Sequence, residues 1–338
     1  MSGITVSGLS FWETLSESVG FKTGVTLGRD ELAELFKSDL RFAELADLPA
    51  DEQHGRRFES VEYEELYHFI LFKLGRLEHE GRSFPVIALH HKYKTHPAQY
   101  ATAMGVAELF VEFGNSIEWE RVVKAIDPSP FLRSARERYG VRGLDMAMEL
   151  LGSVNARAIG SPWSRAREVN WDDEVALRDL FKSEGLIAPD GPFIDQRYID
   201  FLHRNFDRID EVNWRKFEGL TGEFFLREGY EVQLGPGRND GGVDLRVWPK
   251  GNAPGQPPTL LVQCKREKAP ISRVVLKALY ADVVHEGATS GLIVTTSRLS
   301  PGARNDRNAR GYPIEEAERP TVKAWIEKLR QPGAGYVG

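Results

Sequence analysis

The sequence predicts two parts of different fold class, a mainly α-helical N-terminal domain and an α/β C-terminal domain with a mixed central sheet flanked by helices. Apolar residues recur at helical spacing through most of the first half of the chain. After about residue 210, runs of β-branched and apolar residues alternate with helical patterns, as in an α/β sandwich. The total of 338 residues is the length of roughly two domains.

In the first half, helical spacing predicts helices at residues 29–48, 63–77, 99–113, 119–126 and 144–154. The first of these helices would bury one face formed by Leu32, Leu35, Phe36, Leu40, Ala43 and Leu45. We therefore expect residues 1–190 to form a mostly helical domain with a regulatory or targeting role. These residues resemble no family that we recognise.

The turn-rich stretch Ala-Pro-Asp-Gly-Pro at residues 188–192 separates the two halves. We expect a helical connector at 191–212, the α/β domain at 213–330 and a short tail at 331–338. Within the α/β domain, the pattern predicts strands at 230–234, 243–248, 259–265 and 291–296. Helices are expected at 214–227, 273–285 and 321–329, an order that gives a mixed sheet.

Charge is distributed unevenly along the chain. The 44 Lys and Arg against 50 Asp and Glu give a net charge of −6, which excludes a wholly basic nucleic-acid-binding protein. Residues 1–205 carry 24 basic and 33 acidic side chains, whereas residues 206–338 carry 20 basic and 17 acidic ones. We therefore expect a polyanion to meet the second half, and a protein or small ligand to meet the acidic first half.

Cys264 is the only cysteine, so an internal disulfide and a cysteine-based zinc site are both excluded. A chain with no disulfide fits a reducing cytoplasm, and we expect a cytoplasmic location. No apolar run approaches the roughly 20 residues of a membrane span, so neither a signal peptide nor a membrane anchor is expected.

Histidines and tryptophans of the first half admit two interpretations. His90, His91 and His96 could bind a metal, but solvated loop histidines are the simpler interpretation. Stacking on a flipped base is conceivable for the tryptophans, although scattered tryptophans more often belong to a core. The tryptophans concerned are Trp12, Trp119, Trp163 and Trp171.

Polar residues with chemical potential gather on two neighbouring predicted strands. Because side chains alternate along a strand, Asp244 lies on the face opposite Val243, and Gln263 shares a face with Lys265. The Pro- and Gly-rich connection at 249–258 has its centre near residues 253 and 254. A hairpin with that centre would pair Asp244 with Gln263, within one register step.

A carboxylate and an amide oxygen at this spacing suit a hard cation such as Mg²⁺, which prefers oxygen ligands. Lys265 could orient the attacking water or stabilise negative charge in the transition state. Glu218, on the preceding predicted helix, is the best-placed candidate for a third ligand.

Five motifs in this half occur in a recognisable order. They are Phe-Glu at 217–218, Glu-Gly-Tyr-Glu-Val at 228–232, Gly-Arg-Asn-Asp-Gly-Gly-Val-Asp at 237–244, Val-Gln-Cys-Lys-Arg at 262–266 and Gly-Leu-Ile-Val-Thr-Thr-Ser at 291–297. Together they resemble the Mrr-type restriction endonuclease catalytic domain of the PD-(D/E)xK nuclease superfamily, over residues 210–330. The resemblance implies a restriction-endonuclease-like fold.

The resemblance also implies a metal-dependent DNA endonuclease of bacterial restriction or antiphage defence that leaves 5′-phosphate ends. Catalytic residues would be Glu218, Asp244, Gln263 and Lys265. The metal ligands would be Asp244, Glu218, Gln263 and the Cys264 carbonyl. They would hold Mg²⁺, for which Mn²⁺ could substitute. Cutting both strands requires two sites, so we expect a homodimer or higher homo-oligomer.

Basic residues flank the predicted centre, and in a nuclease they would contact phosphates. The candidates are Arg266, Lys268, Arg273, Lys277, Arg298 and Arg304. For any one of them, a solvated surface position is the simpler interpretation. Two alternative functions remain open: a nuclease effector that a ligand or partner activates, and an inactive nucleic-acid-binding module of the same fold. Cleavage assays with and without EDTA separate an active nuclease from the inactive module.

Overall fold

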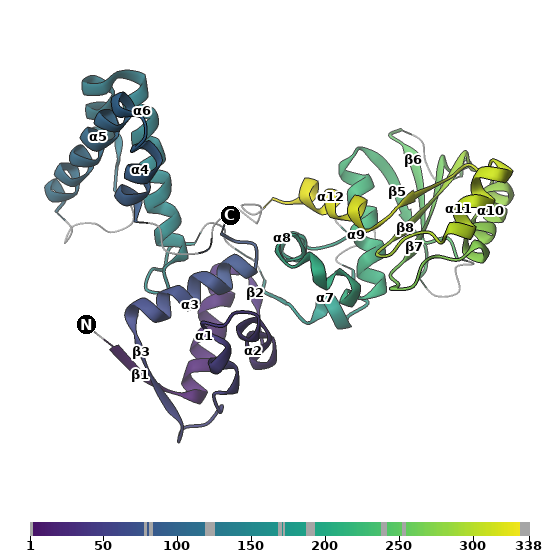
Figure 1. Cartoon of the computed structure of the whole chain (residues 1–338), viewed down its shortest axis with the longest axis horizontal. Helices are drawn as coiled ribbons and strands as arrows, with labels where there is room; N and C mark the ends of the chain where they lie inside the picture. Colours follow the sequence, from purple (N-terminus) through teal and green to yellow (C-terminus); the bar gives the residue numbers. More distant parts are fainter. Residues whose placement is uncertain are drawn as a thin grey trace. The chain divides into compact units, whose positions relative to one another are not determined.

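A computed structural model describes residues 3–77, 80, 84–118, 126–167, 171, 173–186, 193–237, 242–251 and 255–331 (Figure 1). The chain forms two compact units. One comprises Met1–Ile4, Phe58–Phe69 and His79–Glu168, and the other comprises Thr5–Arg57, Ile70–Glu78 and Val169–Gly338. Within the described ranges, no helix combines the length and the apolar character that a membrane span needs.

Three helices dominate the first unit: α4 (Pro85–Tyr93), α5 (Pro97–Ser116) and α6 (Ser129–Gly160). The three helices pack against one another (Figure 1). Their shared core includes Leu89, Val106, Phe131 and Leu150. Residues 99–113 and 144–154 are helical as predicted, whereas the predicted helix at 119–126 lies outside the described residues except for Ile126, which is not helical. Gly140 has φ 67° and ψ −157°, a backbone conformation that is not helical and that favours glycine. It therefore divides α6 into two segments.

The second unit begins with small elements: α1 (Gly8–Thr23), β2 (Val25–Thr26), α2 (Arg29–Lys37), η1 (Ala43–Asp47), β4 (Val175–Ala176), α7 (Asp179–Lys182), α8 (Gln196–Arg204) and η3 (Phe206–Glu211). β2 and β4 pair in parallel. Strand β1 (Gly3–Ser7) pairs with β3 (Gly55–Glu59), which leads into α3 (Ser60–Lys73).

The predicted continuous helix at 29–48 is wrong. Helix α2 stops at Lys37 because Ser38 Oγ donates to the Leu35 carbonyl, and Asp39 Oδ1 then accepts the Arg41 backbone N–H at 2.9 Å. Leu40, predicted to be buried, is 97% exposed in the resulting turn.

A five-stranded mixed sheet organises the rest of the second unit, in the order β5 (Tyr230–Leu234), β6 (Leu245–Pro249), β7 (Leu260–Lys265), β8 (Ser290–Thr295), β9 (Ile314–Ala317). Strand β6 pairs antiparallel with both β5 and β7, and β8 pairs parallel with both β7 and β9. Helices α10 (Arg273–Glu286) and α11 (Pro301–Arg310) cover one face, and α9 (Trp214–Arg227) and α12 (Arg319–Leu329) cover the other (Figure 1). This arrangement confirms the predicted α/β class, a mixed central sheet flanked by helices.

Two elements of this domain were not predicted. Helix α11 has the sequence Pro-Gly-Ala-Arg-Asn-Asp-Arg-Asn-Ala-Arg and buries only Ala303, so it shows no apolar period. Strand β9 has four residues, of which Ile314 and Ala317 are buried. Both depend on neighbours distant in the sequence, which periodicity alone does not show.

The predicted hairpin register is confirmed. Leu245 pairs with Val262 and Arg246 with Leu261, which continues to Asp244 opposite Gln263. Asp244 itself precedes β6, and its backbone N–H donates to the Val262 carbonyl at 2.9 Å. The carboxylate and the amide therefore enter the same region at one end of the sheet.

Core packing of the sheet can be tested with two leucines of opposite exposure. Leu261 on β7 is fully buried, so Leu261→Ala removes packed methyl groups and should lower the free energy of unfolding by about 2–5 kcal/mol. Leu40→Ala, at the exposed turn, should change it by less than about 0.5 kcal/mol. Denaturant unfolding of the full chain measures both, and equal effects would contradict the described core.

Candidate active site

Three elements converge on a cavity of about 280 Å³ at one end of the sheet. Helix α9 brings Glu218, the residue before β6 is Asp244, and β7 contributes Cys264 and Lys265. The remaining lining residues are Trp214, Phe217, Gly237, Gly242, Arg266 and Glu267. The structure therefore brings together residues that the sequence separates by almost fifty positions.

Glu218 and Asp244 form a buried acidic pair, with 4% and 6% of their surfaces exposed. Burial raises the pKa of Glu218 to about 8, and the nearby Asp244 carboxylate adds to the rise through charge repulsion and a side-chain hydrogen bond. At neutral pH the pair thus retains a proton unless a cation replaces it.

Asp244 is oriented by the neighbouring strand. The Cys264 backbone N–H donates to Asp244 Oδ2 at 2.6 Å, a charge-assisted contact. Because the sheet holds that N–H in place, it also fixes the position of the carboxylate. The register of β6 and β7 therefore determines where the acidic group lies.

Gln263 lies opposite Asp244 and is 5% exposed. Its side-chain oxygen, Oε1, is buried and accepts no hydrogen bond from the residues that the structure describes. Leaving a buried carbonyl oxygen unsatisfied costs about 1–3 kcal/mol, and a hard cation would satisfy it. Gln263 is not among the residues that line the cavity, although the register places it opposite Asp244. By its chemistry, an amide oxygen together with two carboxylates is a donor set that fits a divalent cation.

Only two acidic groups contribute to this donor set. Within the described ranges, no group of three or more His, Cys, Asp and Glu side chains could hold a metal ion. The Cys264 thiol contacts Thr221 Oγ1 at 3.5 Å, and burial raises the pKa of the thiol well above its ordinary value. The thiol therefore stays protonated and is a poor metal ligand.

Lys265 is half-buried and lines the cavity. Among the described residues, no carboxylate lies within 4.0 Å of its ammonium group, in contrast to Lys277, which pairs with Asp306 at 3.4 Å. A lysine in this position carries a positive charge into the cavity beside the acidic pair.

Arg215 is a site residue that the sequence reasoning missed. Its guanidinium donates to Glu218 Oε2 at 2.7 Å and to the Gly235 carbonyl at 2.8 Å. The i, i+3 spacing of Arg215 and Glu218 on one helix was visible in the sequence and could have indicated the pair.

The six predicted DNA-binding residues differ in their surroundings. Lys268, Arg273 and Arg298 are exposed, and no carboxylate pairs with them in the part of the chain that the structure describes. Lys277 pairs with Asp306, and Arg304 with Glu318 at 2.5 Å. Arg266 donates to the Asp210 carbonyl at 2.9 Å, so it also stabilises the fold.

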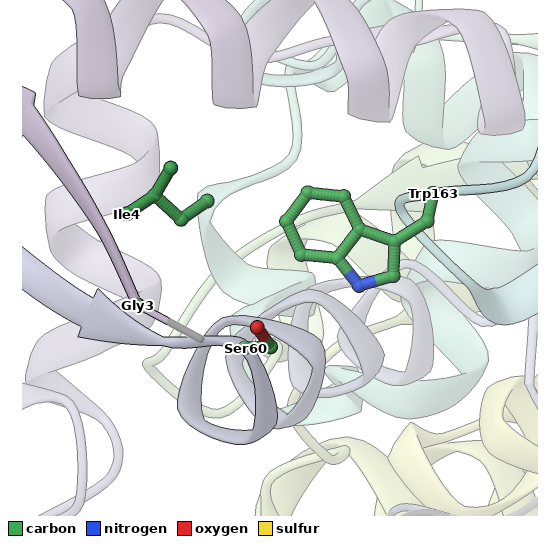
Figure 2. Close-up of a pocket in the computed structure, with 4 residues that line it drawn as sticks. All are labelled: Gly3, Ile4, Ser60 and Trp163. Carbon is green, nitrogen blue, oxygen red and sulfur yellow. The ribbon is translucent and has the colours of Figure 1, made fainter. Parts of the chain in front are cut away.

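A second cavity, of about 390 Å³, lies in the first unit and is lined by Gly3, Ile4, Ser60 and Trp163 (Figure 2). Trp163 is 52% exposed, which corrects the expectation that it belongs to a core. Its Nε1 donates to Glu64 Oε1 at 3.0 Å. The four lining residues include no acidic or basic side chain.

The other residues singled out in the first half have varied surroundings. Trp12 is 4% exposed and belongs to the core as expected, whereas Trp119 lies outside the described residues. Trp171 is contacted by two guanidinium groups, those of Arg76 and Arg197, each 4.6 Å from its ring. His90 Nδ1 lies 3.0 Å from the Tyr100 hydroxyl.

Comparisons with known proteins identify part of the chain. Residues 209–326 match a protein family described as "Restriction endonuclease", Mrr_cat. The uncharacterized protein y4cE of Sinorhizobium fredii (strain NBRC 101917 / NGR234) is 26% identical over 241 residues, which cover 69% of this chain and 56% of y4cE. The chain thus spans little more than half the length of this relative.

Among solved structures, the chain is similar to the MspJI restriction endonuclease in complex with a 27-mer oligonucleotide. The match has 18% sequence identity and a TM-score of 0.27, and it covers 54% of this chain and 40% of the MspJI chain.

The buried acidic pair predicts how stability depends on pH without divalent cations. Between the ordinary glutamate pKa and about 8, the folded chain keeps a proton that the unfolded chain releases, so the free energy of unfolding should fall as the pH rises through this window. Glu218→Gln carries no titratable proton and should remove much of this decline. Denaturant unfolding in EDTA at several pH values measures it, and parallel pH profiles for both proteins would contradict the raised pKa.

Proposed function

We propose that this chain, in which residues 209–326 form an Mrr-type restriction endonuclease domain, is a metal-dependent DNA endonuclease that hydrolyses phosphodiester bonds. The observation that carries the proposal is the convergence of Glu218, Asp244 and Lys265 on one cavity, with Gln263 opposite Asp244 in the strand register. Two buried carboxyl groups, an unsatisfied amide oxygen and an unpaired lysine within the described region together supply the chemistry of hydrolysis.

Asp244, Glu218 and the Gln263 side-chain oxygen would hold the cation, with the Cys264 carbonyl as an additional ligand. Restriction endonuclease domains generally use divalent metals, and Mg²⁺ or Mn²⁺ suits oxygen donors of this kind. Such an ion stabilises negative charge on the phosphate and favours deprotonation of the attacking water. The donor set is supported by the orphaned Gln263 oxygen and by the proton that the acidic pair otherwise retains.

Lys265 would orient the attacking water and stabilise the charge that develops on the phosphate oxygens. Lys265 follows Cys264, whose N–H orients Asp244. The residue that would orient the water and the N–H that orients the carboxylate therefore lie on one strand, β7. A 5′-phosphate end follows if water attacks the phosphorus and the 3′ oxygen leaves.

DNA is the proposed substrate, and bacterial restriction or antiphage defence in the cytoplasm is the proposed setting. The family of the domain supports the first of these. Since one site cuts one strand, we also propose a homodimer or higher homo-oligomer for cutting a duplex. The role of residues 1–190 in control or targeting, and activation by a protein or small ligand, stay predictions.

Single substitutions in the site test the proposed chemistry. Asp244→Ala and Lys265→Ala should each lower the rate of Mg²⁺-dependent cleavage by a factor of at least about 10²–10³, because each removes a group that acts on the transition state. Lys323→Ala, at an exposed position on α12, is the matched control and should cut at the rate of the unsubstituted chain. The substrates are methylated and unmethylated duplex DNA, single-stranded DNA and RNA. Undiminished cutting by either site variant would overturn the assignment.

The exposed basic residues test DNA binding separately from chemistry. Replacing Lys268, Arg273 and Arg298 by Ala should weaken binding to any duplex sequence and reduce the slope of log K against log salt by about 3. Replacing Lys277 and Arg304, which already pair with carboxylates, should have a smaller effect per residue. Fluorescence anisotropy in EDTA at several salt concentrations measures both. An equal loss of DNA affinity per residue in the two sets would contradict the prediction that ion-paired residues contribute less to binding.

A further inference from the structure

Arg215 connects the two halves of the proposed metal site. It lies in the first turn of α9, and its side chain is 16% exposed. One end of the guanidinium donates to Glu218 Oε2, and the other donates to the Gly235 carbonyl just after β5. Because the guanidinium is planar and its donors have a fixed geometry, these two contacts restrain each other.

Gly235 in turn contacts Asp244. The Gly235 backbone N–H donates to the Asp244 carbonyl at 2.7 Å. A chain of hydrogen bonds therefore runs from Glu218 through Arg215 and Gly235 to Asp244. This chain links the carboxylate on the helix to the backbone of the carboxylate beside the strand.

The charge of Arg215, like its hydrogen bonds, favours the close approach of the two carboxyl groups. Two carboxyl groups brought together under burial repel each other, and the guanidinium is the positive group that offsets this repulsion at Glu218. The hydrogen bond from Arg215 to Oε2 restrains the orientation of the Glu218 carboxylate. Removing a group that hydrogen-bonds to a metal ligand without contacting the metal typically lowers metal affinity by about 10–100-fold.

We propose that Arg215 is a positioning residue that orders Glu218 and Asp244 for a divalent cation. The proposal rests on the proposed metal site and adds to it a residue that contacts neither the cation nor the phosphate. It assigns Arg215 an effect on metal affinity, exerted through Glu218, and no direct part in the hydrolysis.

The same helix offers a matched control. At the far end of α9, Arg227 donates to the buried Glu223 at 2.7 Å and to the Leu329 carbonyl at 3.0 Å. Arg227 thus makes both kinds of contact that Arg215 makes, an ion pair with a buried glutamate and a hydrogen bond to a backbone carbonyl, and it also donates to Gln196 Oε1 at 2.8 Å. Its partner Glu223 does not line the cavity, whereas Glu218 does, so Arg227 reports the structural cost of losing such an arginine.

The experiment is a Mn²⁺ titration of the full chain, with free Mn²⁺ measured by electron paramagnetic resonance. Arg215→Ala should raise the Mn²⁺ dissociation constant by about 10–100-fold. The dissociation constant of Arg215→Lys should lie between those of the unsubstituted chain and Arg215→Ala, because one ammonium cannot donate to both acceptors in the same geometry. Arg227→Ala should stay within about twofold of the unsubstituted chain, and thermal unfolding in EDTA checks that each variant is folded.

Cleavage rates separate positioning from a direct catalytic role. If Arg215 acts by ordering the ligands, saturating Mn²⁺ should restore most of the cleavage rate of Arg215→Ala. A rate that stays low at saturating Mn²⁺ would overturn the positioning role, as would an unchanged or tighter Mn²⁺ affinity.

Asp244→Ala distinguishes failure of this proposal from failure of the metal site itself. If Asp244→Ala loses Mn²⁺ binding while Arg215→Ala binds as tightly as the unsubstituted chain, the role of Arg215 is wrong and the metal site stands. If Asp244→Ala binds Mn²⁺ with unchanged affinity, the proposed metal site is wrong.

Discussion

The arrangement of this domain depends on bringing two carboxyl groups together in a buried place. Glu218 comes from a helix and Asp244 from the end of a hairpin, and neither is stable there as an isolated charge. The structure surrounds them with compensating groups: a guanidinium on Glu218 and a strand N–H on Asp244. Burial and repulsion nevertheless keep the pKa of Glu218 high, so the pair is suited to exchange a proton for a cation.

Helix α9 links this pair to residues that precede the domain. The Asn213 backbone N–H donates to the Leu180 carbonyl at 3.0 Å, and Trp214 Nε1 lies 3.3 Å from Glu184 Oε1. Lys216 is buried and donates to the Gly185 carbonyl. The helix that carries Glu218 is therefore held by both the sheet and the chain segment before it.

Much of the C-terminal domain could be predicted because local patterns and packing agree there. Residues 214–227 and 230–234 have the predicted helix and strand bounds, and the hairpin centre places Asp244 opposite Gln263. Prediction failed where local pattern and tertiary contacts disagree. Leu40 fits a helical period but lies in a turn closed by side-chain hydrogen bonds, and α11 has almost no apolar period yet packs through Ala303.

The sequence by itself determined the α/β class, the order of motifs and the strand register, because side-chain alternation and hairpin symmetry depend on neighbours along the chain. Only the tertiary structure decided which groups support the acidic pair. The contact between Arg215 and Gly235 joins two segments that no local period relates. That Gln263 Oε1 has no hydrogen-bond partner among the described residues likewise depends on what packs around it. Burial also decided the protonation of Glu218, since desolvation depends on everything packed around a group and not on the residues beside it in sequence.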